Sequence, residues 1–300
     1  MNKVGFIGLG IMGKPMVVNL YKAGVEVLVN DMNEAVAREL EAESNGLVRF
    51  VDKKTMGEEC DIVMCILPTY DIVTSVLWGE DGVAQYMKPG SIFVNYGSET
   101  ATQSETHAEK LGKLGIKFLD APVSGGEPGA INGTLSIMVG GEEEVFEKVK
   151  PYFLIVGGSA VLIGGVGGGS VCKLVNQIIV NLNIAVVGEA FTFAAKAGVD
   201  PMKVYNAIRG GLAGSRVLDD KVPMIVNRNF VPGGTVKVNH KDIKNVLETA
   251  HNIDVPVPLT AQLFEIQQSR KVAGGFMEDH CSYVKYFETL AGVEVKKVEE

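Results

Sequence analysis

The most informative chemical group in the chain is a lysine near the start of a long helical pattern. A glycine cluster at 164–169 runs directly into residues 169–197, which have helical periodicity. At about 100° per residue, Lys173, Asn176 and Gln177 fall together on one face. Further along, both faces are apolar, which predicts a helix that meets solvent or ligand only near its start and is buried on both sides beyond it. A cation beside two amides at that start is a candidate ligand contact.

A second candidate site is the run Ser124-Gly125-Gly126, which follows an apolar stretch at 116–120. A serine hydroxyl beside consecutive glycine amides can hold an anion, because small residues leave the N–H groups open. A substrate carboxylate would suit this arrangement. Glycine-rich turns are common, so the residues alone leave an ordinary turn as an equal alternative.

A third candidate is a glycine-rich turn at the N-terminus. The pattern G-L-G-I-M-G lies between a predicted strand at 3–7 and a predicted helix at 12–23. Its glycines permit a tight turn, close approach of a pyrophosphate and close packing of helix on strand, with the helix N-terminus facing the anion. This context favours dinucleotide binding over a plain turn. The predicted contacts are Gly8, Leu9, Gly10, Ile11, Met12 and Gly13.

An acidic residue at the end of the next strand bears on which dinucleotide binds. Asp31 follows the predicted strand at 25–30, about where an adenosine ribose would lie, between Asn30 and Met32. A carboxylate accepts hydrogen bonds from ribose hydroxyls and repels a 2′-phosphate, and Met32 offers no guanidinium. The pattern therefore favours NAD(H) over NADP(H). If Asp31 is only a solvated turn residue, the preference stays open.

Further apolar runs predict a parallel sheet that is covered on both faces. Ligands bind beyond the carboxyl ends of such strands, which makes Leu67, Pro68 and Ser98 candidate cofactor contacts, although such loops are often only turns. Residues 121–130 are interpreted as a loop, and a helix is expected at about 142–153. The predicted strands after the second are 61–67, 91–96, 116–120, 134–141 and 159–163.

The second half of the chain shows only helical patterns, with plausible starts at Asp200, Ser215, Asn239 and Glu278. We therefore predict an α/β Rossmann-type domain at 1–165 and an all-α domain at 166–300, joined by the long helix. This architecture would place Lys173 at the interdomain cleft, beside a nicotinamide. The expected helices are 169–197, 201–210, 215–220, 240–251, 258–272 and 278–291.

Composition narrows the classes of partner. A net charge of −8 argues against nucleic acid or an anionic membrane as the main partner. The four cysteines form no CxxC pair, and no signal peptide precedes the first strand, so we expect reduced thiols in a cytoplasmic protein. Polar residues interrupt the longest apolar run, which indicates a soluble core helix rather than a membrane span.

The histidines do not suggest a metal site. His107, His251 and His280 are isolated and lack metal-ligand spacing, so they are interpreted as surface or helix-face residues. His240, beside Lys241, could line the cleft. We expect no metal.

Taken together, three motifs resemble the β-hydroxyacid dehydrogenases, which include 3-hydroxyisobutyrate and 6-phosphogluconate dehydrogenases. They are GFIGLGIMGKPM (5–16), DAPVSGG (120–126) and G-x-x-x-K-x-x-N (169–176), in the family's order and spacing. The second half, with KLVNQIIVNLNIA and GEAFTFAAKAGVDPMKVYNAIRGGLAGSRVLD, is similar to members that act on tartronate semialdehyde. The similarity spans essentially the whole chain.

The resemblance implies roles for the candidate residues. Lys173 would be the catalytic acid/base, and Ser124, Gly125 and Gly126 would hold the substrate carboxylate. Two departures from the family are Gly97, where many members have a hydroxyl residue, and Met32, where related enzymes often have arginine. Gln177 stands where many members have asparagine. The remaining implied positions are Asn176 and Gln177 for orienting substrate, and Lys241 for lining the cofactor and substrate cleft.

The implied activity is the reversible, NAD(P)H-dependent reduction of tartronate semialdehyde to glycerate. Burial in the cleft and the positive end of its own helix would lower the pKa of Lys173 from its ordinary value toward neutrality, where proton exchange works best. The alternatives are 3-hydroxyisobutyrate dehydrogenase or another short-chain semialdehyde reductase, and a non-catalytic dinucleotide-binding module. A small carboxylate-bearing aldehyde or β-hydroxyacid is the expected substrate, and the long apolar helix leads us to expect a homodimer or homotetramer.

Overall fold

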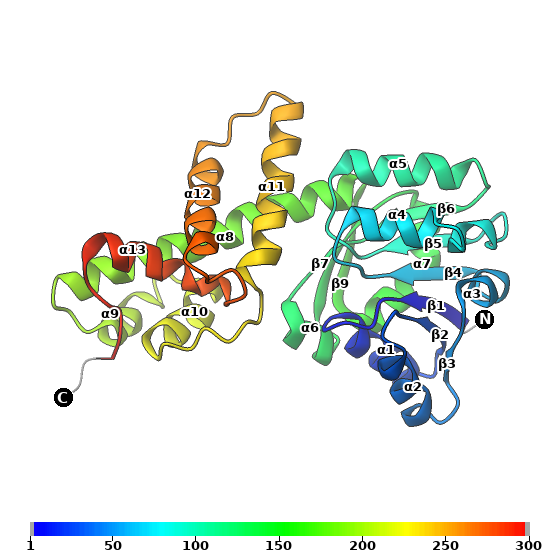
Figure 1. Ribbon diagram of the computed structural model, residues 1–300, viewed down its shortest axis with the longest axis horizontal. Helices are drawn as coiled ribbons and strands as arrows, with labels where there is room; N and C mark the ends of the chain where they lie inside the picture. The colour runs from blue at the N-terminus through cyan, green and yellow to red at the C-terminus, as the bar shows by residue number, and fades with distance from the viewer. Residues whose placement is uncertain (1–2, 298–300) are drawn as a thin grey trace. The chain divides into compact units, whose positions relative to one another are not determined.

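The protein, seen here in a computed structural model, is described over residues 3–297. It forms two compact units that divide between Lys173 and Leu174 (Figure 1). The first unit alternates strands and helices, whereas the second is helical. The predicted fold class, a Rossmann-type unit followed by an all-α unit, is confirmed. Each unit is described in turn.

The first unit follows the strand-helix alternation that the sequence predicts. Its elements are β1 (Lys3–Ile7), α1 (Gly13–Lys22), β2 (Glu26–Asn30), α2 (Glu34–Glu43), β3 (Val48–Phe50), α3 (Lys53–Glu59), β4 (Ile62–Cys65), α4 (Tyr70–Trp78), the 3-10 helix η1 (Val83–Gln85), β5 (Ile92–Asn95), α5 (Ala101–Gly112), β6 (Lys117–Asp120), β7 (Val123–Ser124), α6 (Gly126–Asn132), β8 (Leu135–Gly140), α7 (Glu143–Val156) and β9 (Gly157–Gly164).

The strands form one mixed sheet. Their order is β3-β2-β1-β4-β5-β6-β8-β7, and β9 pairs with β8. Strands β1 to β6 are parallel to one another, with the strand order of a doubly wound dinucleotide-binding sheet. Strand β8 runs antiparallel to β6 and β7 and parallel to β9. The carboxyl ends of β1, β4 and β5 therefore lie at one edge, where the candidate cofactor loops begin.

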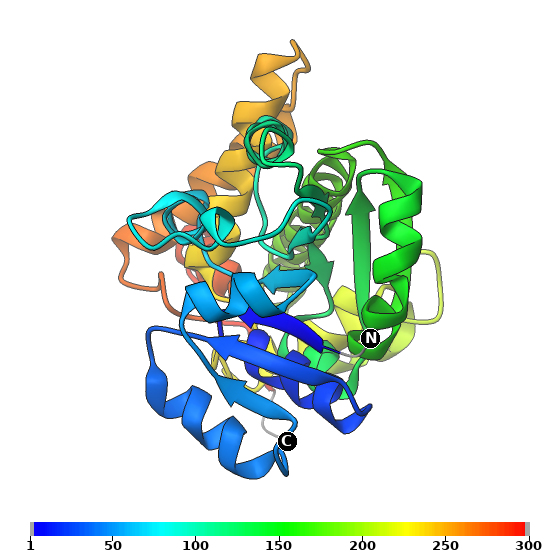
Figure 2. The ribbon, with the colours of Figure 1, turned by 90° about the vertical axis from the view of Figure 1, so that its right-hand side faces the viewer.

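Both faces of the sheet are buried at β1, β2, β4 and β5, because these strands are apolar at successive positions. Along β2, Val27 and Val29 join one core cluster and Leu28 joins the other. The first cluster includes side chains from α1, α2 and α7, and the second includes side chains from α3, α4 and α5. Figures 1 and 2 show α1 and α2 on one side of the sheet and α4 on the other. This two-sided cover is the reason the strands read as continuous apolar runs.

The interpretation of 121–130 as a loop is wrong. This segment forms strand β7 and the start of helix α6. Ser124 pairs with Ser136 of β8, so the segment is an antiparallel partner of that strand. A two-residue strand rich in neighbouring glycine and proline carries no periodicity, and the pairing that stabilises it comes from a distant part of the sequence.

The second unit is built from helices. They are α8 (Gly168–Lys196), whose first residues belong to the first unit, and α9 (Pro201–Ile208), α10 (Arg216–Val226), α11 (Val236–Asn252), α12 (Pro258–Val272), the 3-10 helix η2 (His280–Tyr283) and α13 (Val284–Ala291).

Two of the four predicted helix starts are confirmed. Asp200 and Ser215 cap α9 and α10 by accepting hydrogen bonds from the first-turn amides. The other two predictions are wrong. Thr235, not Asn239, caps α11, and Asp279, not Glu278, caps η2. Thr235 and Asn239 are both conventional cap types, so residue type does not separate them, whereas it does favour Asp279 over Glu278.

Helix α8 is less buried than its apolar sequence predicts. By length and hydropathy it could cross a membrane. Its buried Asn181 donates to the Gln177 carbonyl and accepts from the Tyr283 hydroxyl, so this part of the helix packs against η2 within the second unit. The prediction of burial on both sides is wrong at Val186 and Phe193, which are 58% and 76% exposed.

The four cysteines are free thiols. Cys60, Cys65 and Cys281 are buried, whereas Cys172 in the first turns of α8 is partly exposed. Burial raises the pKa of the Cys60 thiol to about 12 and that of Cys65 well above its ordinary value.

Candidate functional site

The glycine-rich turn has the geometry of a dinucleotide cradle. Gly8 follows β1 with a φ of +98°, in the left-handed region that favours glycine. A Cβ on Gly13 would collide with the Gly8 carbonyl, so the third glycine is needed where α1 packs on the turn. A Cβ on Gly10 would meet no protein atom within 4 Å. Packing therefore does not require a glycine at position 10, whereas close approach of a pyrophosphate does.

Asp31, directly after β2, is hydrogen-bonded to the backbone of this turn. Its Oδ2 accepts a hydrogen bond from the Leu9 amide at 2.6 Å, and its Oδ1 accepts from the Asn33 amide at 2.7 Å. The Asn30 side chain donates to the Val51 carbonyl at 2.7 Å. Met32 is fully exposed. The structure thus places the predicted ribose contact against the predicted pyrophosphate turn.

The loops after β4 and β5 hold the next candidates. Leu67 is half-buried and Pro68 exposed after β4, and Ser98 is half-buried after β5. The departure at Gly97 has a physical reason. The Gly97 amide donates to Asn95 Oδ1 at 2.8 Å, and a Cβ on Gly97 would lie only 2.9 Å from that oxygen. The Asn95 side chain occupies the space that a hydroxyl residue at position 97 would need.

Ser124, Gly125 and Gly126 lie at the junction of β7 and α6. Both glycines have positive φ, +131° and +60°, and both are exposed. The turn therefore presents its backbone outward in a conformation that side chains would disfavour. This is the arrangement expected of an anion cradle.

Lys173 lies in the second turn of α8 and is partly exposed. An aspartate that sequence reasoning missed holds the start of this helix. Asp120, the last residue of β6, accepts hydrogen bonds from the amides of Gly167 at 2.8 Å and Ser170 at 2.7 Å. Burial raises the pKa of its carboxyl, while the two amides act in the opposite direction. The signal available in the sequence was an acid at the end of a strand in the motif DAPVSGG.

In the second unit, the buried carboxylate of Asp242 contacts two of the candidate residues, Gln177 and Lys241. Gln177 Nε2 donates to Asp242 Oδ2 at 2.6 Å and lies 3.3 Å from Asn239 Oδ1. Lys241 Nζ lies 3.2 Å from Asp242 Oδ1. Because its amide nitrogen is already engaged, Gln177 could contact a substrate only through its carbonyl oxygen. The side-chain oxygen of Asn176 is buried and has no hydrogen-bond partner among residues 3–297.

The histidines are more buried than the sequence indicated. His107, on α5, and His280, on η2, lie in the interiors of the first and second units, so the surface alternative is wrong for both. His240 packs on Phe264, with ring centroids 4.5 Å apart, and its Nε2 lies 2.8 Å from Gln268 Oε1. These contacts explain the position of the His240 ring between helices α11 and α12. Residues 3–297 contain no group of three His, Cys, Asp or Glu side chains arranged to hold a metal ion.

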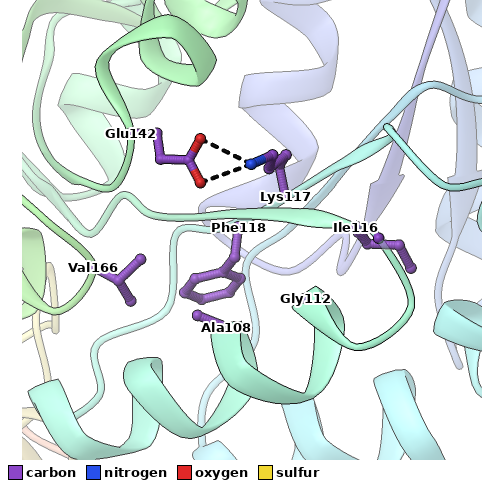
Figure 3. A pocket seen from close by; sticks show the side chains of 8 residues that line it. Ala108, Gly112, Ile116, Lys117, Phe118, Glu142 and Val166 are labelled. Carbon is purple, nitrogen blue, oxygen red and sulfur yellow. Dashed lines mark hydrogen bonds and ion pairs between the residues drawn. The ribbon is translucent and has the colours of Figure 1, made fainter.

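A cavity of about 170 Å³ lies apart from these residues, between α5, β6 and the loop that precedes α8. Figure 3 shows the Phe118 ring beside Val166, with Lys117 and Glu142 paired at one rim. The Lys117–Glu142 pair is about half exposed, at 2.8 Å. No predicted site residue lines this cavity.

The sequence candidates therefore form two groups. The cofactor turn, Ser124–Gly126 and Lys173 belong to the first unit, and Asn176, Gln177 and Lys241 belong to the second. Asp31 and the glycine turn are in direct contact, as are Gln177 and Lys241 with the shared Asp242.

Comparison with known proteins supports the dinucleotide interpretation. Residues 3–165 match the family described as the NAD binding domain of 6-phosphogluconate dehydrogenase. Residues 167–287 match the NAD-binding family of NADP-dependent 3-hydroxyisobutyrate dehydrogenase. Two curated relatives cover nearly the whole chain. The 2-hydroxy-3-oxopropionate reductase of Escherichia coli is 42% identical over 96% of this chain and 98% of its own length. The 2-(hydroxymethyl)glutarate dehydrogenase of Eubacterium barkeri is 34% identical over 98% and 97%.

A solved structure has the same fold over almost the full length. The 3-hydroxyisobutyrate dehydrogenase of Salmonella typhimurium superposes with a TM-score of 0.86 at 28% identity, covering 96% of this chain and 100% of its own. The chain binds a nicotinamide dinucleotide, and it is an oxidoreductase that belongs to the 3-hydroxyisobutyrate dehydrogenase family of β-hydroxyacid dehydrogenases.

Proposed function

We propose that this enzyme reversibly reduces tartronate semialdehyde to glycerate, with NADH as the preferred cofactor. The observation that carries the proposal is the 42% identity, over nearly the whole chain, to a 2-hydroxy-3-oxopropionate reductase. The Ser124-Gly125-Gly126 turn supports it, because an exposed glycine backbone suits the carboxylate of a small substrate. Lys173 supports it as the group able to exchange a proton with the substrate oxygen.

In the proposed reaction each residue has a defined task. When bound, the reduced nicotinamide supplies the hydride to the aldehyde carbon. Lys173 Nζ donates its proton to the carbonyl oxygen as negative charge develops there, and it takes the proton back in the reverse direction. The Ser124 hydroxyl and the Gly125 and Gly126 amides hold the carboxylate. Asn176 offers its buried side-chain oxygen to a substrate hydroxyl.

The proposed preference for NADH is argued from Asp31 and Met32, which follow β2. Asp31 directs a carboxylate at the turn that holds the pyrophosphate, and the exposed Met32 brings no positive charge there. A 2′-phosphate would be repelled, whereas ribose hydroxyls could donate to the free lone pairs of Asp31. The second matching family is described for NADP-dependent enzymes, so the cofactor needs its own test. Asp31→Ser combined with Met32→Arg should reverse the NADH:NADPH ratio of kcat/KM. A wild-type preference for NADPH would contradict the assignment.

The deciding experiment follows NADH and NADPH oxidation with tartronate, methylmalonate and succinate semialdehydes. We expect tartronate semialdehyde to give the highest kcat/KM, and Lys173→Ala to lower kcat about 100-fold or more while the Kd for NADH is kept. Lys113→Ala, at an exposed lysine paired with Glu109, is the matched control and should leave turnover unchanged.

Other outcomes separate the alternatives. A higher kcat/KM for another semialdehyde would move the enzyme toward the 3-hydroxyisobutyrate dehydrogenases or another short-chain semialdehyde reductase. NADH binding without turnover of any of the three would favour a non-catalytic binding module. Normal turnover by Lys173→Ala would remove the lysine from the mechanism.

We also propose that the enzyme is a cytoplasmic homodimer or homotetramer. Four free thiols suit a reducing compartment. On α8, Ile179, Val186 and Phe193 are all more than half exposed and are spaced seven residues apart, which aligns them along the helix as in helix–helix association. Phe193→Glu should lower the sedimentation coefficient toward that of a monomer, whereas Lys196→Glu, in the last turn of the same helix, should not. A monomeric wild type would contradict the proposal.

A further inference from the structure

A buried aspartate connects two parts of the proposed site to one strand end. Asp120 is 1% exposed, and its two carboxylate oxygens accept the amides of Gly167 and Ser170 at the start of α8. The same segment continues from Asp120 to Ser124, four residues later. Lys173 follows Ser170 by three residues, about one helical turn.

The backbone of Asp120 is held firmly on both sides. Within the sheet it is paired with Asn95 of β5 and with Gly140 of β8. Ser124 is paired with Ser136 of the same strand β8. Asp120, which binds the helix start, and Ser124 are therefore both paired with β8.

Two glycines, Gly140 and Gly169, allow the start of α8 to approach strands β6 and β8 closely. A Cβ on Gly140 would collide with Asp120 Oδ1, and a Cβ on Gly169 would collide with the Met138 carbonyl and lie 2.7 Å from the Asp120 carbonyl. The Ser170 hydroxyl also lies 3.0 Å from that of Ser104, on α5. The first turn of α8 is thus packed against β6, β8 and α5, with the Asp120 carboxylate bound to the buried amides of Gly167 and Ser170.

From this geometry we infer that Asp120 is a positioning residue for the reaction. Its carboxylate fixes the first turn of α8 and thereby sets where Lys173 lies relative to the turn that holds the substrate carboxylate. A buried negative charge is itself stabilised at a helix N-terminus, since the unpaired amides there carry partial positive charge. This inference rests on the proposed roles of Lys173 and Ser124, and it assigns Asp120 an action through the start of α8.

The test compares Asp120→Asn with Asp120→Ala. Asparagine has the same size and keeps one acceptor oxygen, whereas alanine removes both. We expect kcat to fall about 10- to 100-fold in Asp120→Asn, and further in Asp120→Ala, because small misplacements of an acid/base group are costly. The KM for the semialdehyde and the Kd for NADH should stay within about twofold of wild type, since the Ser124 turn and the Gly8–Gly13 turn are untouched.

A control separates positioning from general loss of stability. Asp279 is a similarly buried aspartate that caps η2 in the second unit. Asp279→Asn should lower the melting temperature and, at temperatures where the variant is folded, leave kcat unchanged. An equal loss of kcat in Asp120→Asn and Asp279→Asn would overturn the inference, as would wild-type kcat in Asp120→Asn.

Amide hydrogen exchange tests the cap without any substrate. In apo Asp120→Asn, peptides containing Gly167 and Ser170 should exchange about fivefold faster or more, while peptides from α9 keep their rates. Unchanged exchange at 167–170 would overturn the inference. If the wild type reduces none of the semialdehydes, the proposed function fails, and the exchange rates still decide whether Asp120 holds the helix start.

Discussion

Each unit buries an aspartate carboxylate, and the two carboxylates are stabilised in different ways. In the first unit, Asp120 accepts backbone amides at the start of α8, and burial raises the pKa of its carboxyl. In the second unit, Asp279 accepts three backbone amides and also lies 3.0 Å from Lys221 Nζ. Burial alone would raise the pKa of Asp279, but the neighbouring His280 and Lys221 hold it below its ordinary value.

Asp120 is bound by amides and Asp279 also by a cation, and this difference reflects the segments that each carboxylate holds together. Asp279 joins α10, through Lys221, to the loop at Gly233 and Gly234 and to η2. The Lys221 side chain reaches Asp279 from a separate helix, so the ion pair adds α10 to the segments that Asp279 holds. Asp120 instead orients one helix end, for which aligned amides suffice. A buried carboxylate held by a cation should therefore depend on its partner more strongly than an exposed pair does.

The largest loss of stability is expected when Lys221, the cation beside Asp279, is replaced. Lys221→Met leaves Asp279 buried without its cationic partner, which should lower the free energy of unfolding of the helical unit by about 3 to 5 kcal/mol. Urea unfolding measures it. Lys113→Met breaks a pair of similar length, at 2.8 Å, whose members are exposed, and should change the stability very little. Equal losses in the two variants would remove the distinction between buried and exposed pairs.

The next effect compares a buried histidine with an exposed one. Burial lowers the pKa of His107 to about 4, so the folded protein keeps this histidine neutral while the unfolded chain binds a proton below about pH 6.5. Stability should therefore be lost as the pH falls from about 6.5 to 4, by about 3 kcal/mol from His107 at pH 4. His107→Gln should flatten this part of the stability profile, measured by urea unfolding at several pH values. His251→Gln, at an exposed position, should not. A profile unchanged by His107→Gln would show that this ring is not the group responsible.

The smallest expected effects are at the neutral helix caps. Thr100 caps α5 within a reciprocal capping box with Gln103, and Thr235 caps α11 through the Val238 amide. Thr100→Ala and Thr235→Ala should each lower the free energy of unfolding by about 1 kcal/mol. The thermal midpoint of each variant is the measurement. Losses as large as that of Lys221→Met would mean that charge is not what separates Asp279 from the neutral caps.

Periodicity and glycine spacing made most of the architecture predictable. Apolar runs located β1, β2, β4, β5 and β6, because these strands are largely buried and need no alternation to be recognised. The short parallel strand β3 was not predicted, since its three residues include the exposed Arg49. The glycine turn and Asp31 were also predictable, since both belong to one local strand-helix-strand unit. Strand β7 was not, because its pairing with β8 is the only feature that defines it.

Side-chain partners between distant segments could not be predicted. Gln177 was identified as a candidate, but its hydrogen bond to Asp242 joins residues 65 positions apart. Asp120 and Gly167 are 47 positions apart, and although the sequence marks Asp120 as an acid at a strand end, it does not indicate that Gly167 is its partner. The burial of His107 and His280 depends in the same way on packing within each unit. The exposure of Val186 and Phe193 shows the reverse error, since the apolar pattern of α8 predicts burial on both sides.

The four thiols differ in solvent exposure, which should allow one of them to be labelled selectively. Three of the four are enclosed, and burial raises the pKa of each of these well above neutrality, which keeps them as unreactive thiols. Cys172 is partly exposed and immediately precedes Lys173. A maleimide dye added to the folded protein should therefore attach first at this position, without any cysteine having to be removed. The native sequence thus already carries a label site beside the proposed acid/base, suitable for a fluorescence signal of ligand binding.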